Sequence, residues 1–135
     1  MKYLLDSSTC LAVIEDRYPV RMRLMRAQHS GGELFVSAVS VFELSRELAG
    51  GAGEGHAQLL ETFLAGPASV LALEEDDARA AVFIESNLKA SSRALNHTDF
   101  LVAGQALARR MTLVNVGASP LGKIKGLACQ DWGKP

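Results

Sequence analysis

Cysteine is scarce in this sequence, and positive charge is not in excess. The two cysteines among its 135 residues, Cys10 and Cys129, lie far apart and form neither a CxxC motif nor a metal-type spacing. We therefore expect a reducing compartment in which both thiols are small apolar side chains. The formal net charge of −1 provides no overall basic field for nucleic acid, so any such contact needs a local patch.

Long hydrophobic runs are also missing. No apolar stretch approaches the roughly 20 residues of a membrane span, and the short N-terminal run has one lysine and ends at Asp6, which argues against a secretory signal. We therefore expect a cytoplasmic protein without membrane contact. Because 48% of the residues are hydrophobic and 21% are charged, we expect one globular domain over residues 1–135.

Short apolar runs alternate with longer amphipathic segments along the chain. Strands are predicted over Lys2 to Leu5, over Leu34 to Val36, within ASVLALEEDD, over MTLVN and over LACQDW. Helices are predicted over Ser7 to Glu15, from Pro19 to Gly31, over about Ser40 to Leu48, over HAQLLETFLAG, over about Asp77 to Lys89 and over DFLVAGQALARR. This alternation predicts an α/β fold, a three-layer α/β/α sandwich with a mainly parallel central sheet.

Two further expectations concern helix packing and connections. The helix from about Asp77 is expected to bury Ala78, Ala81, Val82 and Leu88. The glycine-rich AGGAGEG segment is expected to connect two helices, and ASSRALNHT is expected to form a loop.

Three acidic residues stand where predicted strands and helices meet. Asp6 follows the first strand, Glu43 lies in the first turn of the helix after the second strand, and Asp99 opens the helix before the TLVN strand. Ligands of open parallel sheets bind beyond the carboxyl ends of the strands. If the strand order brings these junctions together, the repelling carboxylates need a cation. Oxygen ligands without histidine or cysteine suit Mg²⁺ or Mn²⁺, which can activate water and bind a phosphodiester.

Each acid also has a purely structural explanation. Asp6 is a favourable helix N-cap. Glu43 follows Ser40 in SVFE, which is a capping-box pattern, and NHTD, which ends at Asp99, invites the same explanation. Spacing alone leaves both interpretations open for each residue. Three acids at three separate junctions favour the functional one.

Four basic residues are candidate contacts for an RNA backbone. Arg17 and Arg21 belong to an arginine-rich helix, and Lys123 and Lys125 lie in a late loop. The arginines are equally well explained as a solvated helix face.

The order of the motifs resembles the PIN domain family, and most of all the VapC-type toxins of bacterial toxin–antitoxin pairs. KYLLDSSTC is similar to the family's first strand and acid, and VSAVSVFELSREL is similar to its second motif. NHTDFLVAGQALARRMTLVN resembles the third motif, and KIKGLACQDW resembles the family's C-terminal pattern. The resemblance therefore extends over nearly the whole chain.

This resemblance implies a divalent-metal-dependent endoribonuclease in which metal-activated water attacks an RNA phosphodiester. Asp6, Glu43 and Asp99 match the family's metal-binding and catalytic acids, and Ser8 matches a small polar residue that supports the first acid. The resemblance also implies a homodimer that a cognate antitoxin inhibits by placing its C-terminal segment in the crevice.

The sequence departs from the family pattern at one place. The family often has a fourth acid, or an asparagine, just after the TLVT-type strand, where this chain has Gly117 and Ala118. Asn115 is the only nearby polar side chain that could compensate for the missing acid. With three carboxylates, one metal site is favoured over two. Two alternatives stay open: a PIN-like module that binds RNA or protein without cutting, and, less favoured, a receiver-type signalling domain.

Overall fold

The structure is a computed structural model that describes residues 1–50, 54–88 and 95–135. Residues 51–53 and 89–94 lie outside the described residues, and they include parts of the predicted glycine-rich connector and of the predicted loop before Asp99, and also Lys89, the predicted end of the preceding helix. Among the described residues, no helix combines the length and apolar character that crossing a bilayer requires.

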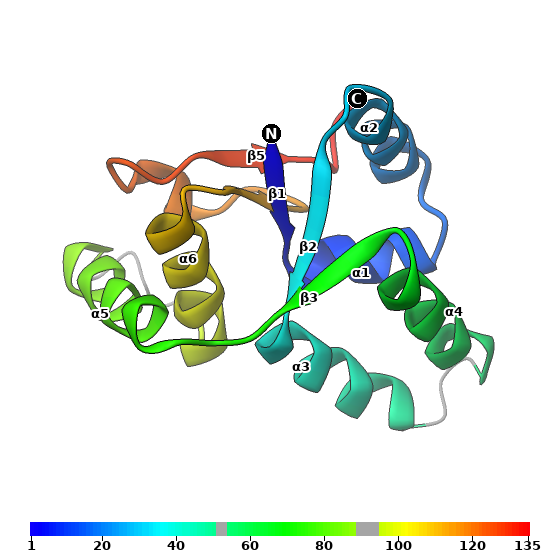
Figure 1. The fold of residues 1–135 in the computed structure, drawn as a ribbon, viewed down its shortest axis with the longest axis horizontal. Coiled ribbons are helices and arrows are strands. Elements are labelled where there is room, and N and C mark those ends of the chain that lie inside the picture. The colour runs from blue at the N-terminus through cyan, green and yellow to red at the C-terminus, as the bar shows by residue number, and fades with distance from the viewer. Residues whose placement is uncertain (51–53, 89–94) are drawn as a thin grey trace.

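A five-stranded sheet forms the centre of the fold (Figure 1). Its strands are β1 (Lys2–Leu5), β2 (Glu33–Ser37), β3 (Ala68–Leu71), β4 (Thr112–Asn115) and β5 (Cys129–Asp131). The order across the sheet is β3-β2-β1-β4-β5, and every neighbouring pair is parallel. Leu5 pairs with Val36 on one side and with Val114 on the other, so β1 lies in the middle.

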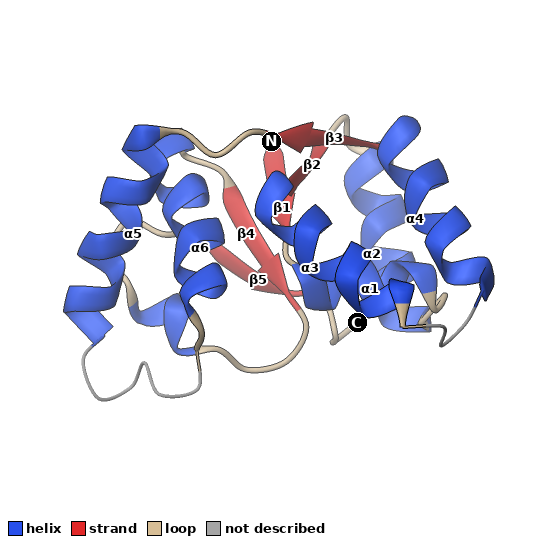
Figure 2. Cartoon of the chain, turned by 90° about the horizontal axis from the view of Figure 1, so that it is seen from below, coloured by secondary structure: helices blue, strands red, loops and turns tan. Residues whose placement is uncertain are grey.

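Helices cover both faces of this sheet. Six α-helices and one 3₁₀ turn are described: α1 (Ser7–Ile14), α2 (Tyr18–His29), α3 (Ala38–Ala49), α4 (Glu54–Ala65), α5 (Glu75–Leu88), α6 (His97–Arg109) and η2 (Pro120–Lys123). Figure 2 shows α5 and α6 together on one side of the sheet and α1 to α4 on the other. The predicted three-layer sandwich is therefore confirmed.

Alternating strand residues supply two separate apolar cores. Leu5 in β1 packs in a cluster with Leu44 of α3 and Leu60 of α4, whereas its neighbour Leu4 packs in a second cluster with Ile84 of α5. Successive side chains of a strand point to opposite faces of the sheet. Strands that are apolar at consecutive positions therefore fit a sheet that is covered on both faces.

The buried side of α5 differs from the expectation at two of the four predicted residues, and Ala78, the first of them, is only half-buried. Val82 is 63% exposed, so the prediction that it is buried was wrong. The buried residues are instead Asp77, Ala81, Ile84 and Leu88, a spacing that follows one face of a helix. Several apolar residues in succession, AAVFI, left the direction of the buried face ambiguous.

Gly104 allows α5 and α6 to approach closely. A β-carbon at this position would lie 2.7 Å from the backbone nitrogen of Ala81 and closer still to the carbonyl oxygen of Asp77. Because backbone atoms cannot rotate away as a flexible side chain can, only glycine fits here without a shift of one helix.

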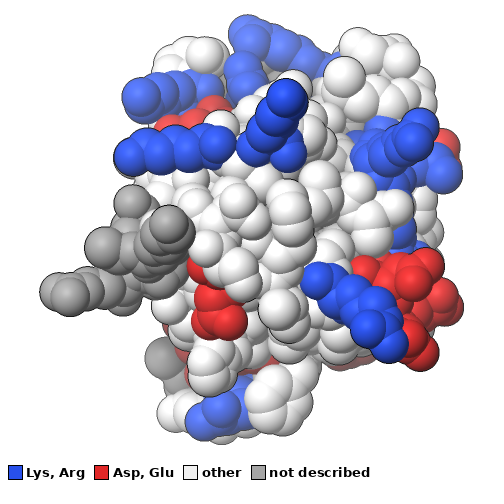
Figure 3. All heavy atoms as spheres, turned by 90° about the vertical axis from the view of Figure 1, so that its left-hand side faces the viewer, with Lys and Arg blue, Asp and Glu red and all other residues white. Residues whose placement is uncertain are grey.

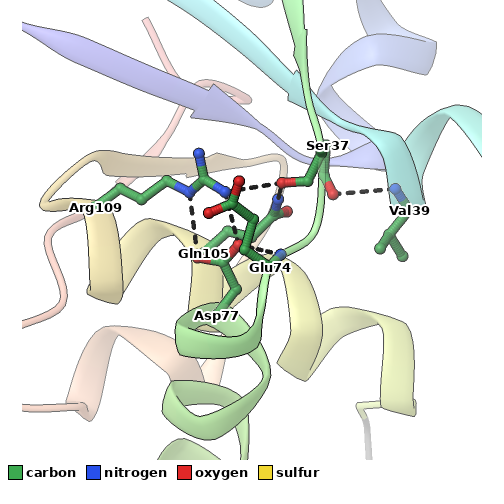
Figure 4. Close-up of polar contacts among 7 residues, drawn as sticks. Ser37, Val39, Glu74, Asp77, Gln105 and Arg109 are labelled. Atoms are coloured by element: carbon green, nitrogen blue, oxygen red, sulfur yellow. Dashed lines mark hydrogen bonds and ion pairs between the residues drawn. The ribbon is translucent and has the colours of Figure 1, made fainter.

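A buried ion pair connects the same two helices (Figure 4). Arg109 in α6 lies 2.8 Å from the Asp77 carboxylate, whose side chain is 2% exposed. The same carboxylate accepts a hydrogen bond from the Glu74 amide, and Arg109 also donates to the Ala72 carbonyl in the connection from β3. The α5–α6 pair is thereby joined to the segment that follows β3.

The strand order reverses at the centre of the sheet. The chain runs outward from β1 to β2 and β3, and it then returns to the other side of β1 through β4 and β5. In open parallel sheets, a crevice forms beyond the carboxyl ends of the strands at such a reversal. The loops after β1 and β4 meet there.

Candidate active site

A pocket of about 180 Å³ lies at this reversal, and all three predicted carboxylates line it. Asp6 comes from the end of β1, Glu43 from α3 and Asp99 from the first turn of α6. Glu43 lies in the second turn of α3 and not in its first turn as predicted, because this helix begins earlier than expected. Ser7 and Ser40 line the same pocket, so the first turns of α1, α3 and α6 face one crevice, and their partial positive charge stabilises negative charge placed there. The expectation that distant acids gather at one place agrees with this geometry.

Asp6 both caps α1 and lines the crevice. Its Oδ1 atom accepts hydrogen bonds from the Ser8 hydroxyl at 2.7 Å and from the Thr9 amide and hydroxyl, each at 2.9 Å. Burial raises the pKa of Asp6 although these donors oppose the rise, and the negative charge of Asp99 adds to it. No described donor bonds to the second oxygen, Oδ2. The N-cap prediction is confirmed, and it does not compete with a role in the crevice.

Ser8 connects the first acid to the loop after β4. Its hydroxyl donates to Asp6 and accepts a hydrogen bond from the Val116 amide at 3.1 Å. This contact is the one that a supporting polar residue would make.

Glu43 is held by residues from two other helices. The capping box that SVFE predicted is wrong, because α3 begins at Ala38 and its N-cap is Ser37. The Glu43 side chain instead accepts a hydrogen bond from the Ser7 hydroxyl at 3.0 Å and one from the Thr98 hydroxyl at 2.6 Å. The local explanation for this acid therefore fails, and its position depends on the packing of α1 and α6 against α3.

Asp99 forms the capping box that NHTD predicted. Its Oδ2 atom accepts a hydrogen bond from the Asn96 amide at 3.0 Å, and its own amide donates to the Asn96 side chain at 2.9 Å. Burial raises the pKa of Asp99, the bond from Asn96 opposes the rise, and the nearby charge of Glu43 adds to it. Like Asp6, it has one carboxylate oxygen that accepts no bond from a described donor.

Ser40 contributes a buried polar atom to the crevice. Its hydroxyl is fully buried, lines the pocket and has no hydrogen-bond partner among the described residues. A buried polar group without a partner is costly, so this hydroxyl is available for a bound ligand. Ser7, Ser40 and Thr98 were not predicted as site residues, although DSST and NHTD place two of them beside the predicted acids.

No fourth carboxylate lines the described part of the crevice. Ala118 lines the pocket where the family often has an acid, and Asn115 lines it beside Ala118. The side-chain nitrogen of Asn115 donates to the Gly117 carbonyl and so shapes the turn after β4. Asp131 lies next to Asn115 in the sheet, but its Oδ1 atom accepts hydrogen bonds from the Gly117 and Gly133 amides.

The oxygen ligands that the crevice offers suit a hard cation that keeps several of its water molecules better than a cation whose ligands all come from the protein. In the described parts of the chain, no three acidic, histidine or cysteine side chains lie close enough together to hold a metal ion as they stand. Asp6 and Asp99 each retain one carboxylate oxygen that no described donor satisfies. Mg²⁺ commonly binds through one or two carboxylates and keeps several water ligands. The carboxylates of Asp6 and Asp99 match both the kind and the number of protein ligands that Mg²⁺ takes.

The four basic candidates do not line the crevice. Arg17 and Arg21 form surface ion pairs with Glu15 at 2.8 Å and Asp16 at 3.0 Å, respectively. Lys123 and Lys125 line a different pocket, beside η2.

Comparison with known proteins agrees with the fold and the motif order. A family model described as PIN domain matches residues 3–118. The tRNA(fMet)-specific endonuclease VapC of Shigella flexneri is 27% identical over an alignment of 138 positions, and the alignment covers 98% of each chain. These findings confirm the resemblance that the order of the motifs indicated.

Solved structures of toxin–antitoxin complexes contain a similar chain. VapBC2 from Rickettsia felis, bound to a DNA fragment from its promoter, matches with a TM-score of 0.84 and 19% identity over 98% of this chain and 99% of that one. DNA-bound VapBC from Salmonella typhimurium matches with a TM-score of 0.81 and 22% identity over 98% of each chain. At this level of identity, the likeness establishes a shared fold.

Proposed function

Because the chain belongs to the PIN domain family, we propose that it is a divalent-metal-dependent endoribonuclease and the toxin of a toxin–antitoxin pair. One observation carries the proposal: Asp6, Glu43 and Asp99 come from distant parts of the chain and line one crevice. Of these, Glu43 has no role in capping its own helix. The endonuclease activity named for the VapC relative supports the same reaction class.

We assign the metal contact to Asp6 and Asp99, with Glu43 beside them. A divalent cation, Mg²⁺ or Mn²⁺, would neutralise phosphodiester charge there and lower the pKa of a water molecule. Burial raises the pKa values of both Asp6 and Asp99, and a neighbouring carboxylate adds to each rise: Asp99 at Asp6, and Glu43 at Asp99. Two such carboxylates are unfavourable when ionised, and a cation relieves that repulsion.

The other residues of the crevice orient the acids. Ser8 and Thr9 hold Oδ1 of Asp6 and leave Oδ2 without a described hydrogen-bond donor, so Oδ2 can bind a ligand. Ser7 and Thr98 hold the two oxygens of Glu43. The buried Ser40 hydroxyl is placed to donate to a phosphodiester oxygen, and the Asn115 side chain supplies polarity where the fourth acid is missing.

The proposed partners follow from the similar complexes. VapBC from Salmonella typhimurium and a toxin–antitoxin complex from Klebsiella pneumoniae contain chains of the same fold. We propose that this protein forms a homodimer in the cytoplasm and that a cognate antitoxin occupies the crevice with its C-terminal segment.

One observation favours a second candidate function, a PIN module that binds RNA or protein without cutting it. Ala118 stands at the crevice where a further carboxylate would complete a second metal site. Phosphodiester cleavage with two metal ions relies on both positions, so a missing ligand set favours low activity or none.

Cleavage of RNA by purified protein separates the two functions. With Mg²⁺ or Mn²⁺, the wild type should cut a structured RNA, and Asp99→Asn should reduce the rate at least about a hundredfold because it removes one charge while the amide still caps α6. Asp76→Asn, the same change at an exposed acid of α5, is the matched control.

Two results would contradict the nuclease. Absence of cleavage by the wild type with either metal would leave the binding module. Undiminished cleavage by Asp99→Asn would mean that this carboxylate is only a helix cap.

A further inference from the structure

We propose that Phe83, Lys123 and Lys125 form a second RNA-contact site, which holds single-stranded nucleotides next to the one that enters the crevice. This inference rests on the proposed function for its substrate class. It assigns that substrate a surface outside the acidic crevice.

The site is a pocket of about 270 Å³ between α5 and the segment after η2. Its apolar floor consists of Leu88 and Ile124, which are 7% and 6% exposed. Phe83 lines the same pocket and remains 54% exposed. An aromatic ring beside an apolar floor offers a flat surface on which a nucleobase can stack.

Two lysines add positive charge to this pocket. Lys123 and Lys125 are exposed, and neither forms an ion pair with a described carboxylate. Arg17 and Arg21 differ, because each is paired with an acid. Figure 3 shows this side of the molecule, where basic side chains gather above a broad uncharged area. Cations without a described acidic partner can bind the phosphates of a nucleic acid, and the aromatic ring can stack on its bases. An apolar peptide would use the ring but not the cations.

The residues that line the pocket follow those of the crevice along the chain. Residues 118–121 line the crevice, and the next residues, 123–125, line this second pocket. A strand that leaves the crevice across η2 therefore meets the lysines and Phe83. The acids of the crevice repel a polyanion, so nearby cations supply attraction that the crevice itself lacks.

Asn87 gives the pocket a hydrogen-bonding group. Its side-chain nitrogen donates to the Phe83 carbonyl at 2.7 Å, which fixes the amide and leaves its oxygen as an acceptor. A base stacked on Phe83 presents donors at its edge only when it is unpaired. The contacts therefore favour a single strand over a duplex.

RNA binding without divalent metal tests the proposal. Anisotropy of a labelled single-stranded 12-mer, measured in EDTA over a range of salt concentrations, reports affinity while metal-dependent cleavage is blocked. Phe83→Ala should weaken binding about tenfold, since one stacked base is lost. Lys123→Gln/Lys125→Gln should lower the slope of log K against log salt by about 1.4, since two phosphate contacts to a single strand are lost.

Matched variants control for surface changes. Lys2→Gln/Lys134→Gln removes the same charge from two exposed lysines that do not line this pocket, and Val82→Ala trims an apolar side chain that is 63% exposed on the same helix as Phe83. Both should bind the 12-mer as the wild type does. Thermal unfolding of every variant verifies that it is folded.

The outcomes distinguish this site from the nuclease. If the lysine variant keeps the wild-type affinity and salt slope, or if the wild type does not bind the 12-mer, the second site is wrong. If Phe83→Ala changes only the oligomeric mass in sedimentation, the ring contacts protein and the proposal also fails. If RNA binding depends on Phe83 and the lysines but the protein cleaves no RNA in Mg²⁺, the second site is supported and the proposed nuclease activity is contradicted.

Discussion

Thr98 donates a hydrogen bond of 2.6 Å to Glu43, although 55 residues separate them in the chain. Ser7 bonds the other carboxylate oxygen of Glu43 from 36 residues away. The second acid of the crevice is thus oriented by the first turns of α1 and α6. The position of the Glu43 side chain therefore depends on how α1, α3 and α6 pack around the end of the sheet.

Removal of the Thr98 hydroxyl should reduce cleavage and leave the fold intact. Thr98→Val keeps the shape of the side chain and removes the hydrogen bond to the charged Glu43, together with the contact of the same hydroxyl to the Asn96 side chain, a loss of roughly 1.5 kcal/mol. We expect cleavage to fall about tenfold, measured as kcat/KM on one RNA. Thr62→Val is the matched control, because the Thr62 hydroxyl bonds only the exposed Gln58 carbonyl. Equal activity of the two variants would contradict an orienting role for Thr98.

Metal binding should appear as thermal stabilisation. A ligand that binds only the folded state at a hundred times its Kd adds about 2.7 kcal/mol, so saturating Mg²⁺ or Mn²⁺ should raise the Tm of the wild type by several degrees. Asp6→Asn should lose most of this increase. An increase of the same size in Asp6→Asn would place the metal elsewhere.

This stabilisation should depend on pH in a defined direction. Burial raises the pKa values of Asp6 and Asp99, so in the metal-free protein both bind protons at a higher pH than ordinary aspartates. The metal-induced increase in Tm should therefore shrink as the pH falls, before ordinary carboxylates protonate. Without metal, both groups should destabilise the folded state as the pH rises through their raised pKa values, because the folded state then binds more protons than the unfolded state. Tm measured across pH with EDTA or Mg²⁺ checks both trends.

The Asp77–Arg109 pair should contribute strongly to stability. Arg109→Met leaves the Asp77 carboxylate buried without its cation, and we expect a loss of about 3 kcal/mol in the free energy of unfolding. Arg79→Met breaks a pair whose side chains are 74% and 76% exposed, and it should cost less than about 0.5 kcal/mol. Urea unfolding of both variants measures the difference. Similar losses would mean that burial does not strengthen the Asp77 pair.

The same pair should make stability sensitive to acid. Although burial acts to raise it, the pKa of Asp77 is lowered, because hydrogen bonds from Arg109 and the Glu74 amide outweigh desolvation. A lowered pKa contributes stability that is present above the ordinary aspartate value and is lost as the pH falls through the lowered one. The destabilisation by Arg109→Met should therefore be largest near neutral pH and shrink in strong acid.

Gly104→Ala should destabilise the α5–α6 pair. The added methyl group meets backbone atoms of Asp77 and Ala81, and we expect a loss of about 2 to 3 kcal/mol from overpacking. Gly55→Ala in α4 has nothing within 4 Å of the added carbon and should stabilise the protein by about 0.5 to 1 kcal/mol. Chemical unfolding of the two variants should shift in opposite directions. A stabilising Gly104→Ala would show that the helices separate without cost.

Local patterns predicted the parts of the site that depend on near neighbours. Asp6 and Asp99 occupy the capping positions that DSST and NHTD indicated, because an N-cap contacts amides only two or three residues away. The same reasoning failed for Glu43, because SVFE forms a capping box only if the helix begins after Ser40, and α3 begins at Ala38. The prediction that Val82 is buried was wrong for a related reason, since a run of apolar residues does not show which face of the helix its neighbours cover.

The sequence by itself determined the α/β class, the positions of the strands and the three acids, because apolar periodicity and capping are local properties of a chain. Only the tertiary structure decided that β1 lies between β2 and β4, and that order brings the acids to one crevice. It also decided that Ser7 and Thr98 orient Glu43, and that Lys123 and Lys125 line a second pocket, which Arg17 and Arg21 do not. Such contacts join residues tens of positions apart, and their formation depends on how whole helices pack on the sheet.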